Sequence, residues 1–118
     1  MEQISEEMNF RQKEIVLLPY PFTDQEGKKV RPAVIISNDL FNKNSHDCIL
    51  VPMTSVIKNE ICSVIINKED IALGNIPKQS RIRYDKLFAI DKNLIIMGIG
   101  KLKDRKFEEI KQKIIKLF

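Results

Sequence analysis

Four polar side chains at the ends of apolar stretches could act together on a phosphate. Arg31 stands directly before a proline at the start of an apolar run, and the proline favours an extended backbone at this arginine. Thr54 and Ser55 follow a second apolar run, and Ser80 opens a further β-like stretch. A guanidinium beside hydroxyl groups can clamp a phosphate, because arginine presents a planar fork of donors. Taken alone, residues of these types are more often surface cations or turn hydroxyls, and periodicity does not bring them together.

The motifs of most common catalytic and metal sites are missing from the sequence. It contains no glycine-rich phosphate loop, no zinc-protease motif and no serine between the glycines of a nucleophile elbow. His46 is the only histidine, which excludes a two-histidine ribonuclease mechanism, and its polar neighbours predict a solvated loop. Cys48 and Cys62 are expected to be buried free thiols rather than a disulfide, and with one histidine they form no recognisable zinc site. We therefore expect neither a metal nor a cofactor.

The elements that would position the polar side chains are short β-strands. Strands are expected at residues 15–18, 33–37, 48–51, 62–66, 80–84, 87–90 and 94–99. The run 33–37 is apolar on both faces, which predicts a central strand. In residues 80–84 the alternation places Arg81 and Arg83 on one face and Ile82 on the other. Several short strands at this spacing, with little helix between them, predict a small antiparallel barrel.

The C-terminal stretch changes to a helical period. Apolar residues recur at spacings of three and four (Phe107, Ile110, Ile114 and Leu117), which predicts an amphipathic helix with Asp104 as its N-cap. The predicted fold class is therefore mostly β, a β-rich α+β fold. It is a small SH3-like barrel of antiparallel strands with a C-terminal amphipathic helix. We expect one domain over residues 14–118, preceded by an extension over residues 1–13.

The charge distribution indicates a polyanionic partner. The chain has 118 residues, of which 43% are hydrophobic and 31% charged, as in one globular domain. Its net charge is +4, but residues 78–118 alone carry +7. This basic third is a candidate nucleic-acid surface, although the lysines of the predicted helix explain part of the excess. No apolar run has the length of a membrane span and no signal peptide is apparent, so we expect a cytoplasmic protein.

Several blocks of the chain resemble the PemK/MazF toxin family. Residues 14–24 resemble the family's opening strand and loop, and residues 30–39, Val-Arg-Pro-Ala-Val-Ile-Ile-Ser-Asn-Asp, resemble its most characteristic segment. Residues 52–55, Pro-Met-Thr-Ser, are similar to its Pro-Ile-Thr-Ser element. Ser80 with residues 85–92 resembles a further block, and residues 99–102 before the final helix resemble another. The blocks occur in the family's order, and the resemblance covers about residues 14–118.

The resemblance implies a toxin of a type II toxin–antitoxin pair. Such toxins are homodimeric, sequence-specific endoribonucleases that cut single-stranded RNA, mostly mRNA, without a metal, and a cognate antitoxin protein binds them. By position, the catalytic pair would be Arg31 and Thr54. The expected substrate-binding residues are Thr23, Asp24, Ser55, Ser80, Arg81, Arg83, Asp85 and Lys86. Among these, Arg81, Arg83 and Lys86 would hold backbone phosphates, and bases could stack on Tyr20 or Phe22.

The chemistry of metal-free RNA cleavage favours an electrostatic role for the arginine. The 2′-hydroxyl attacks the adjacent phosphate, and negative charge grows on the non-bridging oxygens, where Arg31 and Thr54 would stabilise it. A guanidinium is a poor general base because it stays protonated, so Asp24, Asp85 or a water molecule would take the proton. Two other functions stay open. One is a non-enzymatic toxin of the same fold that binds and inhibits DNA gyrase, and the other is a passive nucleic-acid-binding barrel.

Overall fold

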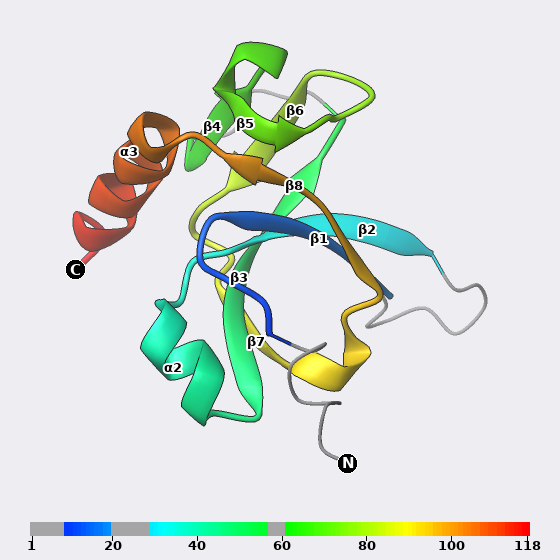
Figure 1. Cartoon of the computed structure of the whole chain (residues 1–118). Coiled ribbons are helices and arrows are strands. Elements are labelled where there is room, and N and C mark those ends of the chain that lie inside the picture. The colour runs from blue at the N-terminus through cyan, green and yellow to red at the C-terminus, as the bar shows by residue number, and fades with distance from the viewer. Residues whose placement is uncertain (1–8, 20–28, 57–60) are drawn as a thin grey trace.

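The computed structural model describes residues 9–19, 29–56 and 61–118. Within these residues the chain forms antiparallel strands and two α-helices (Figure 1). The strands are β1 (Glu14–Pro19), β2 (Val30–Ile35), β3 (Asp47–Thr54), β4 (Ser63–Ile66), β5 (Ile71–Gly74), β6 (Ser80–Arg83), β7 (Phe88–Asp91) and β8 (Met97–Leu102). The helices are α2 (Asp39–Asn44) and α3 (Asp104–Ile115), and two short 3-10 turns are η1 (Lys68–Asp70) and η2 (Lys92–Leu94).

The strands form one strongly curved sheet in the order β4-β6-β3-β2-β1-β8-β5, and β7 also pairs with β3. Strand β3 pairs with three strands and joins β4 and β6 to the rest of the sheet. Its first half pairs with β7, its middle with β2, and its end with β6, where Thr54 lies opposite Arg81. All of these pairs are antiparallel, so the predicted class is confirmed: a mostly β fold with a C-terminal helix.

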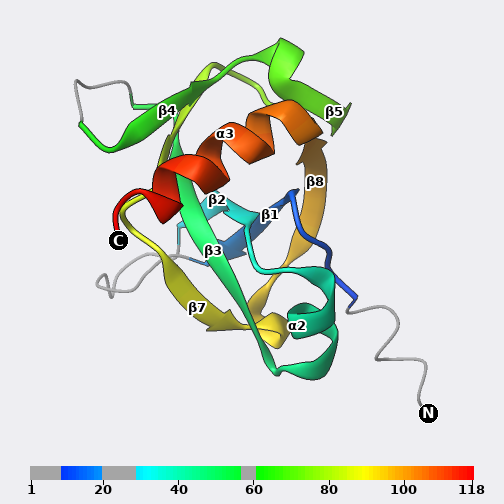
Figure 2. The same cartoon turned by 90° about the vertical axis from the view of Figure 1, so that its left-hand side faces the viewer.

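Alternate residues of the central strands fill two apolar clusters, one on each side of the sheet. On β2, Val34 belongs to the cluster that also contains Ile110 of α3, whereas Ala33 and Ile35 belong to the cluster that contains Ile90 of β7. Figure 2 shows α3 crossing the face of β3, at some distance from β7. The apolar sequence of residues 33–37 is therefore explained as predicted, by a central strand that is covered on both faces.

Helix α3 forms where the apolar residues change to a helical period, as predicted, but Asp104 is the first residue of the helix and not its N-cap. Phe107 and Ile110 are buried and the lysines of its outer face are exposed, as the pattern predicts. The N-cap is Lys103, which makes no side-chain capping bond, so the prediction that Asp104 caps the helix was wrong by one residue. Asp104 lies in the first turn, where a carboxylate interacts favourably with the helix dipole.

Two further predictions of local structure are corrected. Cys48 and Cys62 are free thiols as expected, but only Cys48 is buried; Cys62 precedes the edge strand β4 and is partly exposed. The polar stretch around His46 (residues 42–47) was predicted as a loop, but its first three residues belong to α2. His46 lies exposed between α2 and β3, as expected of a solvated histidine.

The residues just before β1 contact the domain closely. The backbone N–H of Gln12 donates to the Asp39 carboxylate at 2.8 Å, and that of Lys13 donates to the Ile35 carbonyl at 2.8 Å. Phe10 packs against the second apolar cluster. A boundary between an extension over residues 1–13 and a domain over residues 14–118 stays a prediction.

Candidate active site

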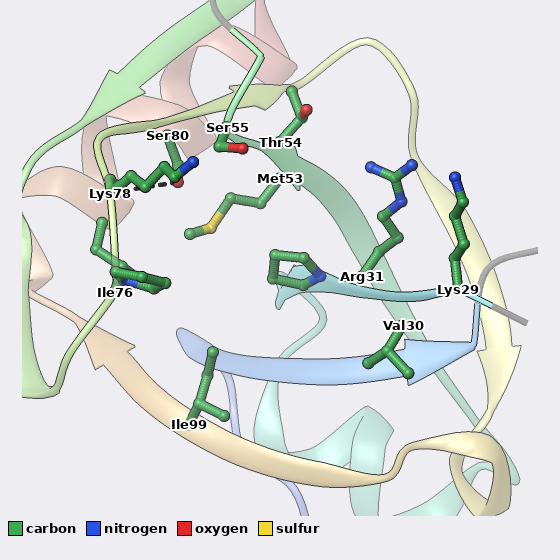
Figure 3. A pocket seen from close by; sticks show the side chains of 12 residues that line it. Lys29, Val30, Arg31, Met53, Thr54, Ser55, Ile76, Lys78, Ser80 and Ile99 are labelled. Atoms are coloured by element: carbon green, nitrogen blue, oxygen red, sulfur yellow. Dashed lines mark hydrogen bonds between the residues drawn. The ribbon is translucent and has the colours of Figure 1, made fainter.

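A cavity of about 380 Å³ opens where the start of β2, the end of β3 and the segment before β6 meet (Figure 3). Four of the predicted site residues line it: Arg31, Thr54, Ser55 and Ser80. They come from three separate parts of the chain, and only the pairing of β2 with β3 and of β3 with β6 brings them together. These four residues therefore form a spatial cluster, and their role as a phosphate clamp stays a prediction.

Arg31 and Thr54 are close neighbours in this cluster. Both also line a second, smaller cavity of about 70 Å³, which extends towards Phe88 of β7. Arg31 is the second residue of β2 and lies opposite Leu18 of β1, so its backbone is held in a paired strand. Its side chain is half-buried, and Figure 3 shows its guanidinium pointing towards the end of β3 that carries Thr54.

The Thr54 hydroxyl is held by the turn that ends β3. The backbone N–H of Val56 donates to the Thr54 Oγ1 at 3.1 Å, a side-chain-to-backbone bond typical of threonine at a turn. A hydroxyl oxygen that accepts a bond still has its own hydrogen to donate. Thr54 can therefore serve as a donor to an oxygen in the cavity while its oxygen stays anchored.

The two serines lie on the same side of the cavity as Thr54. Ser55 is exposed and its hydroxyl is directed into the open space, whereas Ser80 is buried and donates to the Lys78 carbonyl at 3.1 Å (Figure 3). That bond fixes the bend in the chain just before β6. Ser80 thus contributes to the cavity wall by shaping the segment that carries Lys78.

Sequence reasoning missed two lysines of the cavity, Lys29 and Lys78. Both are exposed, and among the described lining residues the charged groups are these two and Arg31, all positive. Lys29 stands two residues before Arg31 and directly precedes β2, so an extended backbone at this point would place both side chains on one face. For Lys78 the sequence contains no comparable signal, since it lies in an irregular segment. The cavity therefore attracts anions.

The opposite wall of the cavity is apolar. Val30, Met53, Ile76 and Ile99 line it, and Figure 3 shows them below the row of polar groups. Gly74 helps to position Ile99: it has a φ of 78°, and a Cβ there would overlap the Ile99 carbonyl. Met53 and Ile76 are almost fully buried, so Val30 and Ile99 are the members of this wall that a nucleobase could contact.

Four expected substrate-binding residues lie outside this cavity: Arg81, Arg83, Asp85 and Lys86. Arg81 is only 8% exposed, and its Nη1 donates to the Ser63 hydroxyl at 2.6 Å. Its Nε has no hydrogen-bond partner among the described residues. Arg83 forms an ion pair with Asp85, with Nε and Oδ1 at 3.4 Å, and Lys86 is exposed. The alternation of the strand holds, because Ile82 faces the core, but the face of Arg81 is covered as well. The phosphate-binding role of these residues stays a prediction.

Four residues with predicted roles lie outside the described residues: Tyr20, Phe22, Thr23 and Asp24. In the described parts of the chain, no group of three histidine, cysteine or carboxylate side chains could hold a metal ion. No helix in those parts is long and apolar enough to cross a membrane.

A comparison with models of protein families identifies the family of this chain. A family model described as the PemK-like, MazF-like toxin of type II toxin–antitoxin systems matches residues 11–118. The chain belongs to this toxin family. A comparison with curated protein sequences gives no significant match for the toxin.

Solved structures share the toxin's fold at low sequence identity. A MazE–MazF complex from Deinococcus radiodurans has a TM-score of 0.75 and 19% identity, over 92% of this chain and 95% of that chain. An endoribonuclease from a mycobacterial species has a TM-score of 0.71 and 15% identity, over 92% and 89%. A mycobacterial endoribonuclease in complex with its cognate antitoxin has a TM-score of 0.72 and 15% identity, over 91% and 92%. The toxin therefore has the MazF fold over nearly its whole length.

Proposed function

We propose that this toxin is a sequence-specific, metal-independent endoribonuclease that cleaves single-stranded RNA. The observation that carries the proposal is the cavity in which Arg31 and Thr54 lie together, surrounded by hydroxyl groups and positive charge. The family match and the two endoribonucleases among the structural neighbours support the same reaction. A gyrase-binding toxin would have no need of such a cluster, and a passive RNA-binding barrel would form no products.

The proposed reaction is an internal transfer of the phosphate. The 2′-oxygen forms a bond to the adjacent phosphorus as the bond from phosphorus to the 5′-oxygen breaks, which leaves a 2′,3′-cyclic phosphate and a 5′-hydroxyl. The proton of the 2′-hydroxyl goes to a base, and the departing 5′-oxygen takes up a proton. Arg31 and Thr54 donate to the non-bridging oxygens as their negative charge increases, and each donor of this kind lowers the barrier by about 3 kcal/mol.

The base that takes the proton of the 2′-hydroxyl is a different group from the anion site. Asp85 is exposed, pairs with Arg83 and does not line the cavity, so Asp24 or a water molecule is the better candidate. DNA is excluded as a substrate by the chemistry, because it lacks the 2′-hydroxyl that attacks.

Cleavage in EDTA tests the proposal directly. Purified toxin is expected to cut single-stranded RNA, and Arg31→Ala is expected to cut at least about 100-fold more slowly while staying folded. Arg105→Ala is the matched control, since Arg105 is an exposed arginine on α3. Fragments should accept phosphate from polynucleotide kinase at their 5′ ends without prior phosphatase treatment. Full activity of Arg31→Ala would remove Arg31 from the mechanism, and the absence of any cleavage by the wild type would reject the enzyme.

We further propose a homodimer in the cytoplasm that is neutralised by a cognate antitoxin. A positively charged cavity can accept an acidic, initially disordered antitoxin segment in place of RNA. The structural neighbours include toxins in complex with their antitoxins. Light scattering of the purified toxin tests the dimer, and a monomer at micromolar concentration would contradict it. Inhibition of cleavage by the antitoxin, competing with RNA, tests the shared site.

A further inference from the structure

The two lysines that the sequence did not single out stand at opposite ends of the candidate active site. In Figure 3 the polar tips form a row in the order Lys78, Ser55, Thr54, Arg31 and Lys29. Figure 3 shows the side chains of Lys29, which directly precedes β2, and of Arg31 directed to the same side, whereas Lys78 is carried by the segment before β6. The catalytic pair thus lies between two further cations.

Both lysines are suited to bind a solvated anion. They are exposed, and the ion pairs found between described residues include neither of them. Other lysines of the toxin are paired: Lys106 contacts the Glu109 carboxylate at 2.9 Å and Lys13 that of Asp104 at 3.1 Å. A lysine ammonium is a compact charge on a flexible stem, so it binds a phosphate without demanding one geometry.

The walls of the cavity define how a strand would lie. The polar row borders one side and the aliphatic residues border the other, so a backbone along the row would direct its bases towards the aliphatic wall, where Val30 and Ile99 are accessible. A row of separated cations matches the repeating phosphates of a nucleic acid better than it matches a single small anion.

We infer that Lys29 and Lys78 are RNA-positioning residues, which bind the backbone phosphates on the two sides of the phosphate held by Arg31 and Thr54. The inference rests on the proposed function, because it takes the RNA site to be this cavity. It assigns the two lysines to substrate binding and leaves the chemical step to the residues between them.

Salt dependence of binding measures these contacts without any cleavage. The probe is a single-stranded RNA with 2′-O-methyl groups throughout, which lacks the attacking hydroxyl. Each phosphate contact contributes about −0.7 to the slope of log K against log salt concentration for a single strand. Lys29→Ala and Lys78→Ala are each expected to reduce the steepness of the slope by about 0.7 and to weaken binding for all sequences alike. Lys→Arg at either position should restore the slope.

The matched control is Lys113→Ala, because Lys113 is an exposed lysine on α3 that does not line the cavity. It should leave the slope unchanged. On cleavable RNA, the cavity variants should raise KM with kcat within about threefold of the wild type, since the phosphate contacts are made equally in ground and transition states.

The outcomes separate this inference from the proposed activity. Unchanged slopes for Lys29→Ala or Lys78→Ala, as for the control, would overturn the inference even if the wild type cleaves RNA. A wild type that binds the methylated probe with the expected slopes but cleaves no RNA would reject the activity and support the positioning role. A fall in kcat without a change of slope would also overturn the inference.

Discussion

Replacing Thr54 by valine tests the anion site with little change of shape. Valine keeps the branched side chain that suits the end of β3, but it removes the hydroxyl that the cavity presents. Two losses follow, one in stability and one in catalysis, and the structure allows each to be assigned a magnitude. Their difference in size is what makes the substitution informative.

The loss of stability should be small. The bond from the Val56 N–H to Thr54 Oγ1 is at the exposed end of the strand, where water can replace the hydroxyl. A typical hydrogen bond contributes about 0.5–1.5 kcal/mol net, and an amide that water can reach belongs to the lower end of this range. The catalytic loss should be larger, since removing one preorganised donor costs about 2.7–4 kcal/mol, or about 100- to 1,000-fold in kcat. Thr54→Ser retains the hydroxyl and is expected to stay within about tenfold of the wild type.

The assay is single-turnover RNA cleavage in EDTA with the toxin in excess, combined with urea unfolding of the same preparations. A valine variant that is nearly as stable as the wild type but cleaves at least about 100-fold more slowly would support the reasoning. If Thr54→Val cleaves within threefold of the wild type, or if Thr54→Ser is as slow as Thr54→Val, the hydroxyl has no role in stabilising the transition state.

Two further predictions concern the fold around the site. Burial raises the pKa of the Cys48 thiol from 9.0 to about 11, so the unfolded chain ionises first and stability should fall between pH 9 and 11. Between pH 7.5 and 10.5 the free energy of unfolding should fall by up to about 2 kcal/mol less in Cys48→Val than in the wild type, as measured by urea unfolding. Ser63→Ala should lower the free energy of unfolding by about 1.5–3 kcal/mol, because Ser63 accepts from the buried guanidinium of Arg81.

Controls accompany both of these experiments. The wild type supplies the reference for Cys48→Val, since the other groups that titrate at high pH are common to both proteins, and identical losses of stability in the two would contradict the predicted role of the thiol. For Ser63→Ala the matched control is Ser55→Ala, an exposed serine whose loss should change stability by less than about 0.5 kcal/mol. An equal effect of both alanine substitutions would contradict the structural role of the bond to Arg81.

Strands with strong apolar runs were predictable from the sequence, and elements held by tertiary contacts were not. The runs that became β1, β2 and β3 are rich in branched apolar residues, which suit a covered sheet. Helix α2 has no apolar period; the Asn38 side chain caps it, and buried Asn42 donates to the Ser37 carbonyl at 2.9 Å. Strand β5 was missed because it is a short, mostly exposed edge strand that ends at Gly74.

The candidate site was likewise predictable only in part. Residue types identified Arg31 and Thr54 as possible phosphate ligands, but only the register of β2, β3 and β6 places them in one cavity, and no local pattern specifies that register. The burial of Arg81 was also hidden, because an alternating strand does not reveal whether its second face is covered. Its partner, Ser63, lies 18 residues away in the chain.

The walls of the cavity come from parts of the chain that are synthesised at different times. Arg31 and Thr54 belong to the first half of the chain, whereas Ser80 and Ile99 come later, and Ile99 lies in β8, which pairs with β1. While the chain is being synthesised, β1 has no β8 to pair with, and the aliphatic wall is incomplete. A nascent chain therefore contains Arg31 and Thr54 long before the cavity around them can be complete.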